Sequence, residues 1–292
     1  MAERLGEVEA RRASVAELGT VTDAMRSLAA VRLQQASSML GGTRTYADVV
    51  AGALAQAVAL SAAAPGRWPA NGRGHTALVL FAPEHGFVGA FAERLVDVAL
   101  AAPADRALWV VGSRGAALLE EHGREVAWSL PMATHTDAVT VMVRRVADAL
   151  YHAAAEDRLG AVELLYGRTT AGAPPELVRE MLLPLDLTRF RPAGGAVPPL
   201  TNLPPGQLVA RLVDEYMFAL LAHAAMESFA AENAARLSVM MAARQNIADT
   251  LEELTGIVRR LRQEQITTEL IELATGAEAL HTPTGTRAEV RR

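Results

Sequence analysis

The chain has 292 residues, of which 51% are hydrophobic and only 4% aromatic, and its formal net charge is −5. This length can bury a sizeable core in one or two domains, and an apolar content led by Ala, Leu and Val is typical of helix-rich proteins. The acidic balance disfavours a general nucleic-acid binder, which normally carries a basic excess. All 28 basic residues are arginine and there is no cysteine. Disulfides, thiolate metal sites, a Walker A loop and Schiff-base chemistry are therefore excluded.

Residues 1–64 are predicted to form one long helix that stops at the Ala-Pro-Gly run 64–66. Gly41 and Gly42 should weaken it locally, by about 1 kcal/mol each relative to alanine. Its apolar side chains recur at helical spacing, with Arg12 and Thr22 as polar interruptions. The predicted stripe consists of Leu5, Val8, Val15, Leu18, Met25 and Ala29.

A second long helix is predicted for residues 203–280, because the segment from Gln207 to Ala279 holds no proline. Steps of three and four residues separate its apolar positions, which is a heptad pattern that requires a partner helix. Arg244 interrupts this pattern at one position. The pattern consists of Leu237, Met240, Ile247, Leu251, Leu254, Val258 and Leu261. We therefore predict that the two helices pair as an antiparallel coiled coil, and that the polar residues 281–292 form a flexible tail.

Between the helices, residues 70–195 alternate between strand and helix patterns. This alternation predicts a small open α/β sheet of Rossmann or flavodoxin type at one end of the coiled coil. The predicted strands are residues 76–83, 107–113, 126–130, 161–169 and 178–187, and the predicted helices are 86–100, 114–122 and 136–155.

Motifs that would carry chemistry are weak. The Gly86-x-x-Gly89 turn follows a strand, where backbone N–H groups could hold a phosphate, but it lacks the G-x-G-x-x-G spacing. Gly112 after the second strand is equally weak, so tight turns are the preferred interpretation of both. The seven histidines are scattered, with no helical pair at the spacing of metal ligands. We expect no catalytic residue, no cofactor and no metal, although a catalytic triad assembled in space is not excluded by sequence.

Several stretches, in order along nearly the whole chain, resemble the γ subunit (central stalk) of rotary F-type ATP synthases. The stretch from 262 to 280 is the longest and most specific of them. The stretches are residues 21–33 (VTDAMRSLAAVRL), followed by Tyr46 at a family tyrosine; 86–91 (GFVGAF), a glycine-rich turn; 182–185 (LLPL), the end of the sheet domain; and 227–246 and 262–280 (RQEQITTELIELATGAEAL), the C-terminal helix.

This resemblance implies a rotor rather than a catalyst. It implies that the coiled coil stands inside a ring of three α and three β subunits, where the nucleotide chemistry happens. The α/β domain would sit at the foot with the ε subunit, on the membrane c ring, and ion flow through that ring would be coupled to ATP synthesis or hydrolysis. The chain would be peripheral, on the cytoplasmic side of the inner (plasma) membrane of a bacterium, without nucleic acid and without direct membrane insertion.

The resemblance also implies which residues couple rotation to chemistry. Arg262 and Gln263 match a polar pair that catches the β subunit, and a planar guanidinium fits a carboxylate with two parallel hydrogen bonds. Met25 and Arg236 match positions where the helices cross and contact β, and Thr267 and Glu269 belong to the interacting C-terminal set. Without the family match, a charged residue on a long helix is most simply part of a solvated face.

Departures from the family pattern indicate a divergent member. Asp23 stands where a lysine is usual, Arg259 where an asparagine is usual, and the turn at 82–92 reads APEHGFVGAFA instead of following S-D-R-G-L-C-G-G-F-N. Whether the chain serves a main or an alternative ATPase, and whether the ion is a proton or sodium, stays open.

Two other functional classes also stay open from the residues alone. One is a coiled-coil scaffold or adaptor with no role in nucleotide turnover, and the other is a small α/β enzyme with helical arms. Residues 262–280 favour the shaft, because an adaptor has no reason to carry that string.

Overall fold

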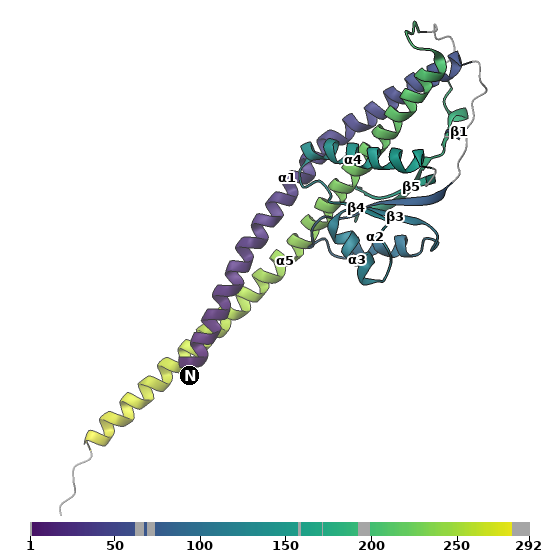
Figure 1. Cartoon of the computed structure of the whole chain (residues 1–292). Coiled ribbons are helices and arrows are strands. Elements are labelled where there is room, and N and C mark those ends of the chain that lie inside the picture. Colours follow the sequence, from purple (N-terminus) through teal and green to yellow (C-terminus); the bar gives the residue numbers. More distant parts are fainter. Residues whose placement is uncertain are drawn as a thin grey trace, which may run out of the picture. The chain divides into compact units, whose positions relative to one another are not determined.

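Two very long helices, α1 (Ala2–Leu60) and α5 (Pro205–His281), enclose an α/β domain in the chain order (Figure 1). The computed structural model describes residues 2–61, 67–68, 74–156, 159–170, 172–191 and 199–281. Both predicted helices are confirmed, whereas the predicted tail beyond His281 lies outside the described residues. Packing divides the chain into a helical unit, Met1–Ala24 with Met241–Arg292, and a sheet unit, Met25–Met240. The sheet unit thus combines the α/β domain with the adjoining parts of both helices.

Within the sheet unit, α1 runs through Gly41 and Gly42 without a break. Each glycine lowers helix propensity, but contacts with α5 hold this segment in place. The Thr43 hydroxyl lies 3.1 Å from Nδ1 of His223, and the Tyr46 hydroxyl donates to the Glu215 carboxylate. Residue numbers rise along α1 while they fall along α5, so the two helices are antiparallel here.

The predicted open α/β sheet is confirmed, with strand order β4-β3-β2-β5-β6. The first four strands of this order are parallel, and β6 runs antiparallel to β5 at the edge. A separate pair joins β1 to β7, which the short helix η1 (Leu187–Arg189) follows. The strands are β1 (Arg67–Trp68), β2 (His75–Phe81), β3 (Ala107–Val111), β4 (Trp128–Leu130), β5 (Leu159–Arg168), β6 (Glu176–Leu183) and β7 (Leu185–Asp186).

Both faces of the sheet are covered. On β2, Leu78 and Leu80 pack with α2 (Phe91–Leu100) and α3 (Ser113–Glu121). The alternate residues of the same strand belong to a second core with α4 (Thr136–Ala155) and the first half of α5. A strand buried on both faces is expected to be a continuous apolar run, as the sequence of β2 is.

Two predicted boundaries are wrong for identifiable reasons. Helix α2 begins at Phe91 rather than Gly86, because Phe87 (φ 61°) and Gly89 (φ 57°) adopt left-handed backbone conformations that a right-handed helix does not accommodate. The predicted strand 178–187 is divided into β6 and β7 at Pro184. Proline has no N–H to donate to a strand ladder.

An ion triad around Glu163 on β5 joins this strand to Arg179 on β6 and to Arg106 in the turn directly before β3. Its carboxylate accepts from Arg106 at 2.5 Å and from Arg179 at 3.1 and 2.6 Å. Burial alone would raise the pKa of Glu163, but the hydrogen bonds and charges of Arg179 and Arg106 outweigh it, so the pKa lies below its ordinary value.

The triad predicts acid sensitivity of the fold. Because the folded pKa of Glu163 is depressed, its stabilisation is present above the unfolded pKa of about 4.3 and is lost as pH falls through the folded pKa. Glu163→Gln should therefore lower the melting temperature at neutral pH and reduce its fall below about pH 4. Glu176→Gln is the control, because it removes only an exposed pair with Arg168. An unchanged acid dependence in Glu163→Gln would contradict the prediction.

A second prediction concerns Gly167 on β5, where α2 and α5 approach the strand. A Cβ at this position would lie 2.5 Å from Cζ of Phe91 and 2.9 Å from Cβ of Ala231. We expect Gly167→Ala to lower the free energy of unfolding by about 1–3 kcal/mol, the usual cost of overpacking. Gly52→Ala is the matched control, since nothing lies within 4 Å of its Cβ position in α1. The measurement is the free energy of unfolding of both variants from urea titration. A wild-type value for Gly167→Ala would contradict the close packing around Gly167.

Candidate functional site

The helical unit is an antiparallel two-helix shaft. Arg262 donates to Glu9 of the other helix, and Arg244 pairs with Asp23 at 3.2 Å. Residue numbers therefore fall along α5 as they rise along α1. The heptad positions predicted for this part of α5 face the partner helix. Leu254 and Val258 are 6% and 2% exposed, and Ile247, Leu251 and Leu261 are half-buried.

The predicted stripe on α1 is wrong at one position. Leu18 is 59% exposed, and Gly19 lies at the seam in its place. A Cβ at Gly19 would lie 3.3 Å from Cγ2 of Ile247, so the missing side chain allows the two helices to approach closely. The seam thus steps by four residues from Val15 to Gly19, not by three.

The end of α5 extends beyond the described start of α1. Glu9 pairs with Arg262, and α1 begins at Ala2, about two turns before Glu9. Figure 1 shows α5 continuing past the start of α1, which is marked N. Leu270 and Leu273 in this stretch are 61% and 70% exposed. A helix end that exposes large apolar side chains is a candidate surface for another protein.

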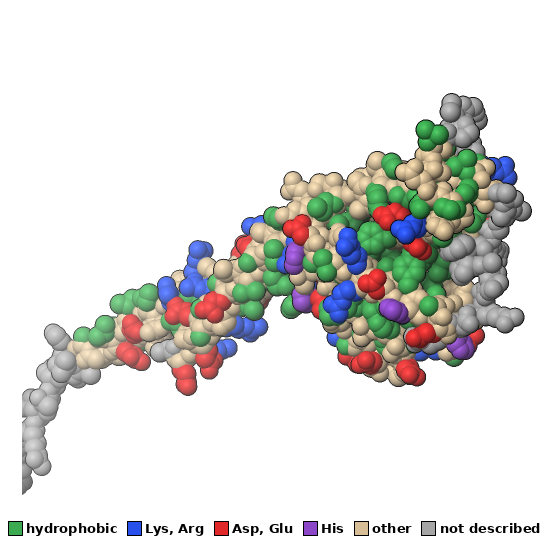
Figure 2. Space-filling view, turned by 45° about the horizontal axis from the view of Figure 1, so that its top comes forward, with side chains coloured by type: hydrophobic (Ala, Val, Ile, Leu, Met, Phe, Trp, Pro, Cys, Tyr) green, Lys and Arg blue, Asp and Glu red, His purple; other side chains and the backbone are tan. Residues whose placement is uncertain are grey.

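Four of the six predicted coupling residues lie on this end of α5, on two different faces. Arg262 and Glu269 are seven residues apart and share the face that is directed toward Glu9 of α1. Gln263 and Thr267 are four apart, and they line a shallow exposed hollow together with Arg260, Glu264 and Thr268. Figure 2 shows acidic and arginine side chains interspersed along this helical part.

The contacts of these four residues are mostly local. The bond from Arg262 to Glu9 uses one Nη2 group, and the arginine side chain remains 60% exposed. Thr267 donates to the Gln263 carbonyl at 2.8 Å, and Glu269 accepts from Gln265 at 2.9 Å. The site therefore presents polar side chains on a rigid helix, which is suited to binding and not to bond chemistry. Sequence reasoning missed Glu9, because nothing local marks a residue whose partner lies at the other end of the chain.

The other two predicted residues, Met25 and Arg236, belong to the sheet unit. Met25 is half-buried on α1. Arg236 is only 6% exposed and donates to Glu232 at 2.7 Å and to the carbonyls of His85 and Gly86. The contact of Arg236 with another subunit stays a prediction. Within the sheet unit, its guanidinium binds the loop at 85–86 to α5.

The turn after β3 holds a carboxylate of the same chain. Glu84 accepts hydrogen bonds from the backbone N–H and hydroxyl of Ser113, at 3.0 and 2.8 Å, and from the N–H of Met132 at 2.8 Å. Gly112 before this helix start has φ 127°, and a Cβ there would lie 2.2 Å from the Ala82 carbonyl oxygen. The Glu84 carboxylate therefore caps the N-terminus of α3, where a phosphate could otherwise bind. This agrees with the tight-turn interpretation.

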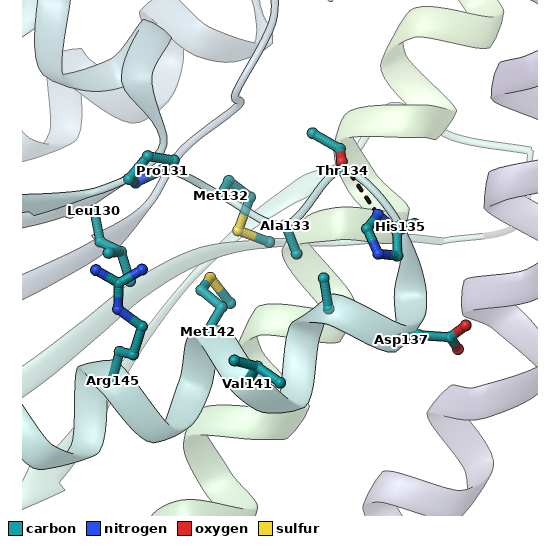
Figure 3. A pocket seen from close by; sticks show the side chains of 11 residues that line it. Leu130, Pro131, Met132, Ala133, Thr134, His135, Asp137, Val141, Met142 and Arg145 are labelled. Carbon is teal, nitrogen blue, oxygen red and sulfur yellow. Dashed lines mark hydrogen bonds between the residues drawn. The ribbon is translucent and has the colours of Figure 1, made fainter.

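An open groove of about 480 Å³ lies where β4 ends and α4 begins (Figure 3). Its lining is mainly apolar, with Met132, Val141 and Met142 between the polar side chains of Asp137 and Arg145. Within the described part of the chain, no cluster of three or more potential metal ligands occurs. The helices of that same part also lack any stretch apolar and long enough to cross a bilayer.

The comparisons with known proteins agree with this geometry. The family model described as ATP synthase matches residues 4–280. The chain is 30% identical to the "ATP synthase gamma chain" of Burkholderia ambifaria, covering 94% of this chain and 98% of the relative. It is 27% identical to the protein of the same name from Parafrankia sp., covering 96% and 99%.

Solved structures show the same fold. A chain of the Euglena gracilis mitochondrial ATP synthase (OSCP/F1/c-ring) superposes with a TM-score of 0.68 at 14% identity, covering 100% of both chains. A chain from the central stalk and c ring of the Tetrahymena thermophila enzyme gives a TM-score of 0.54 at 21% identity, covering 76% of this chain and 99% of that one.

Proposed function

Because the chain belongs to the ATP synthase family as a γ chain, we propose that it is the central rotor shaft of an F-type ATP synthase. It couples ion flow through a membrane c ring to ATP synthesis or hydrolysis by rotating inside an α3β3 ring. The observation that carries this function is the family match over residues 4–280, which includes both long helices and the domain between them. The match supports the shaft and not the adaptor.

The mechanism rests on unequal binding. A shaft with different side chains on its different faces presents a different surface to each β subunit as it turns, and so favours one β conformation over another. Reversing a 1:99 population requires about 5.5 kcal/mol of differential contact. The exposed end of α5 offers both kinds of contact that this needs, the polar pair Arg262 and Gln263 and the apolar residues Leu270 and Leu273.

Arg262 and Gln263 are suited to different roles. The single Arg262 bond to Glu9 leaves other N–H groups of the guanidinium fork for a β carboxylate. Gln263 and Thr267 lie on the neighbouring exposed face, where a second subunit contacts them after partial rotation. The hydrogen bond to the Glu9 carboxylate orients the Arg262 side chain before the arginine contacts the β subunit.

The α/β domain is the proposed foot of the shaft. We propose that it binds the ε subunit and the c ring, on the cytoplasmic side of a bacterial membrane, and that the chain is not itself catalytic. The Tetrahymena neighbour, whose structure is described as central stalk and c ring, supports this placement. The open apolar groove beside α4 and the internal capping by Glu84 agree with a binding domain.

Reconstitution tests the function directly. Combined with α and β subunits encoded beside it, the chain should form a stable particle whose ATP hydrolysis depends on its presence. The readouts are size-exclusion chromatography and steady-state turnover with and without the chain. Absence of a complex together with unchanged turnover would refute the shaft and favour an adaptor.

Arg262→Ala and Gln263→Ala should each reduce the number of ions pumped per ATP while leaving the fold intact, because both side chains are exposed on a continuous helix. The measurement is ion uptake by vesicles that contain the complete enzyme, divided by ATP hydrolysed. Arg259→Ala, another exposed arginine of α5, is the matched control and should pump normally. Normal pumping in both test variants would remove these residues from the coupling set.

A further inference from the structure

A row of polar side chains on α5 is buried against the α/β domain. Ser228, Glu232 and Arg236 are spaced four residues apart on one face of the helix, and Glu227 lies beside the first of them. Their exposed fractions are 2%, 4%, 6% and 8%, respectively. We call these four residues the α5 ladder.

Each member of the ladder bonds to backbone at the end of a middle strand or in the loop that follows it. Ser228 donates to the Phe81 carbonyl at 2.8 Å, where β2 ends. Glu232 accepts from the Glu84 N–H at 3.2 Å, in the loop that follows. Glu227 accepts from the Thr169 N–H at 3.4 Å, directly after β5.

Arg236 completes the row. It donates to the carbonyls of His85 and Gly86, each at 3.2 Å, while Glu232 at 2.7 Å balances its charge. Removing two charges from water is costly, and a buried ion pair is by itself a poor source of stability. A pair that also satisfies three backbone groups of one loop fixes that loop at a defined position along the helix.

Apolar side chains also pack α5 against the domain, among them Phe229, Ala231 and Ala235. Apolar contact is non-directional and roughly proportional to buried area, so it opposes separation more than sliding. Hydrogen bonds depend steeply on distance and angle, so they oppose sliding and twisting. The ladder engages β2 and β5, which are neighbours at the middle of the sheet.

We propose that the α5 ladder is the torque-bearing attachment of the α/β domain to the shaft, with Arg236 and Glu232 as positioning residues. This inference rests on the proposed function, in which the domain is driven by the c ring. Force applied to the domain reaches α5 through the ends of the two middle strands. The ladder converts it into rotation of the helix without slip between helix and sheet.

The first test uses the full chain alone. Arg236→Met should make the Glu84 amide exchange its hydrogen faster by about tenfold or more, because the loop loses its charged donor. The exchange rates of the Thr169 and Glu84 backbone amides are measured together, by hydrogen exchange with mass spectrometry or NMR. Arg244→Met is the matched control, since this arginine on the same helix is 59% exposed and pairs with Asp23 on α1. It should leave both amides unchanged.

The second test measures slip in the assembled α3β3 particle. The chain has no cysteine, so Glu120→Cys provides a unique attachment point for a probe on the exposed part of α3. In the pauses between steps, the angular distribution of the probe should be wider with Arg236→Met than with wild type or Arg244→Met. In the complete enzyme the same variant should pump fewer ions per ATP at a high opposing gradient than wild type or Arg244→Met.

Ser228→Ala is a second variant that removes one neutral hydrogen bond and leaves no charge unpaired. Ser228→Ala should also make the amides exchange faster and widen the angular distribution of the probe, by less than Arg236→Met does. If neither variant changes the probe width, apolar packing alone carries the torque and the proposal is wrong. If turnover does not depend on the chain at all, the shaft function fails, whereas the amide exchange still reports whether the ladder holds the loop.

Discussion

The constraint on which the sheet unit depends is that one helix, α5, packs against two different partners at once. Between residues 209 and 236 its side chains contribute to both hydrophobic cores of the α/β domain and also lie against α1. Such a helix has to be apolar around most of its circumference, and Phe229, Ala230 and Ala231 are all at most 2% exposed. Four of the buried polar residues in this stretch, those of the α5 ladder, bond to backbone groups at or just beyond strand ends, whereas Asn233 donates to the Phe229 carbonyl of its own helix.

Beyond Met240, α1 is the described element that packs on the same helix within its unit, and the sequence pattern of α5 changes accordingly. The buried apolar positions narrow to a heptad seam, and the other faces carry polar side chains together with the exposed Ile266, Leu270 and Leu273. One continuous helix thus carries two sequence patterns, a buried one for the domain and an amphipathic one for the shaft. This change explains why the heptad could be recognised from sequence only from Leu237 onward.

Much of the fold follows from periodicity. Helix α4 was predicted with the bounds that it has, and each core strand was found, because buried runs and amphipathic helices leave local signals. The errors lie where a local signal was overruled. Leu18 is the better apolar residue, yet Gly19 occupies the seam because close approach of the helices favours the absence of a side chain. The start of α2 depends on the positive φ of Phe87, a backbone conformation that a phenylalanine in the sequence does not predict.

The candidate site divides in the same way. The string from 262 to 280 could be identified by resemblance, but its geometry could not, since Glu9 and Arg262 are joined only by the pairing of distant helices. Arg236 was singled out for an outward contact, whereas its burial follows from a loop that no periodic pattern places. Residue identity indicated importance, and the fold determined which contact each residue makes.

The uncovered end of α5 also has a consequence for how the protein is made. A helix that displays Ile266, Leu270 and Leu273 to water attracts any complementary apolar surface, including the same helix of another copy. On the proposed function, these apolar side chains stay exposed to water until a ring of partner subunits encloses them. In the proposed assembly, enclosure of this end by the ring competes with association between two copies of the chain.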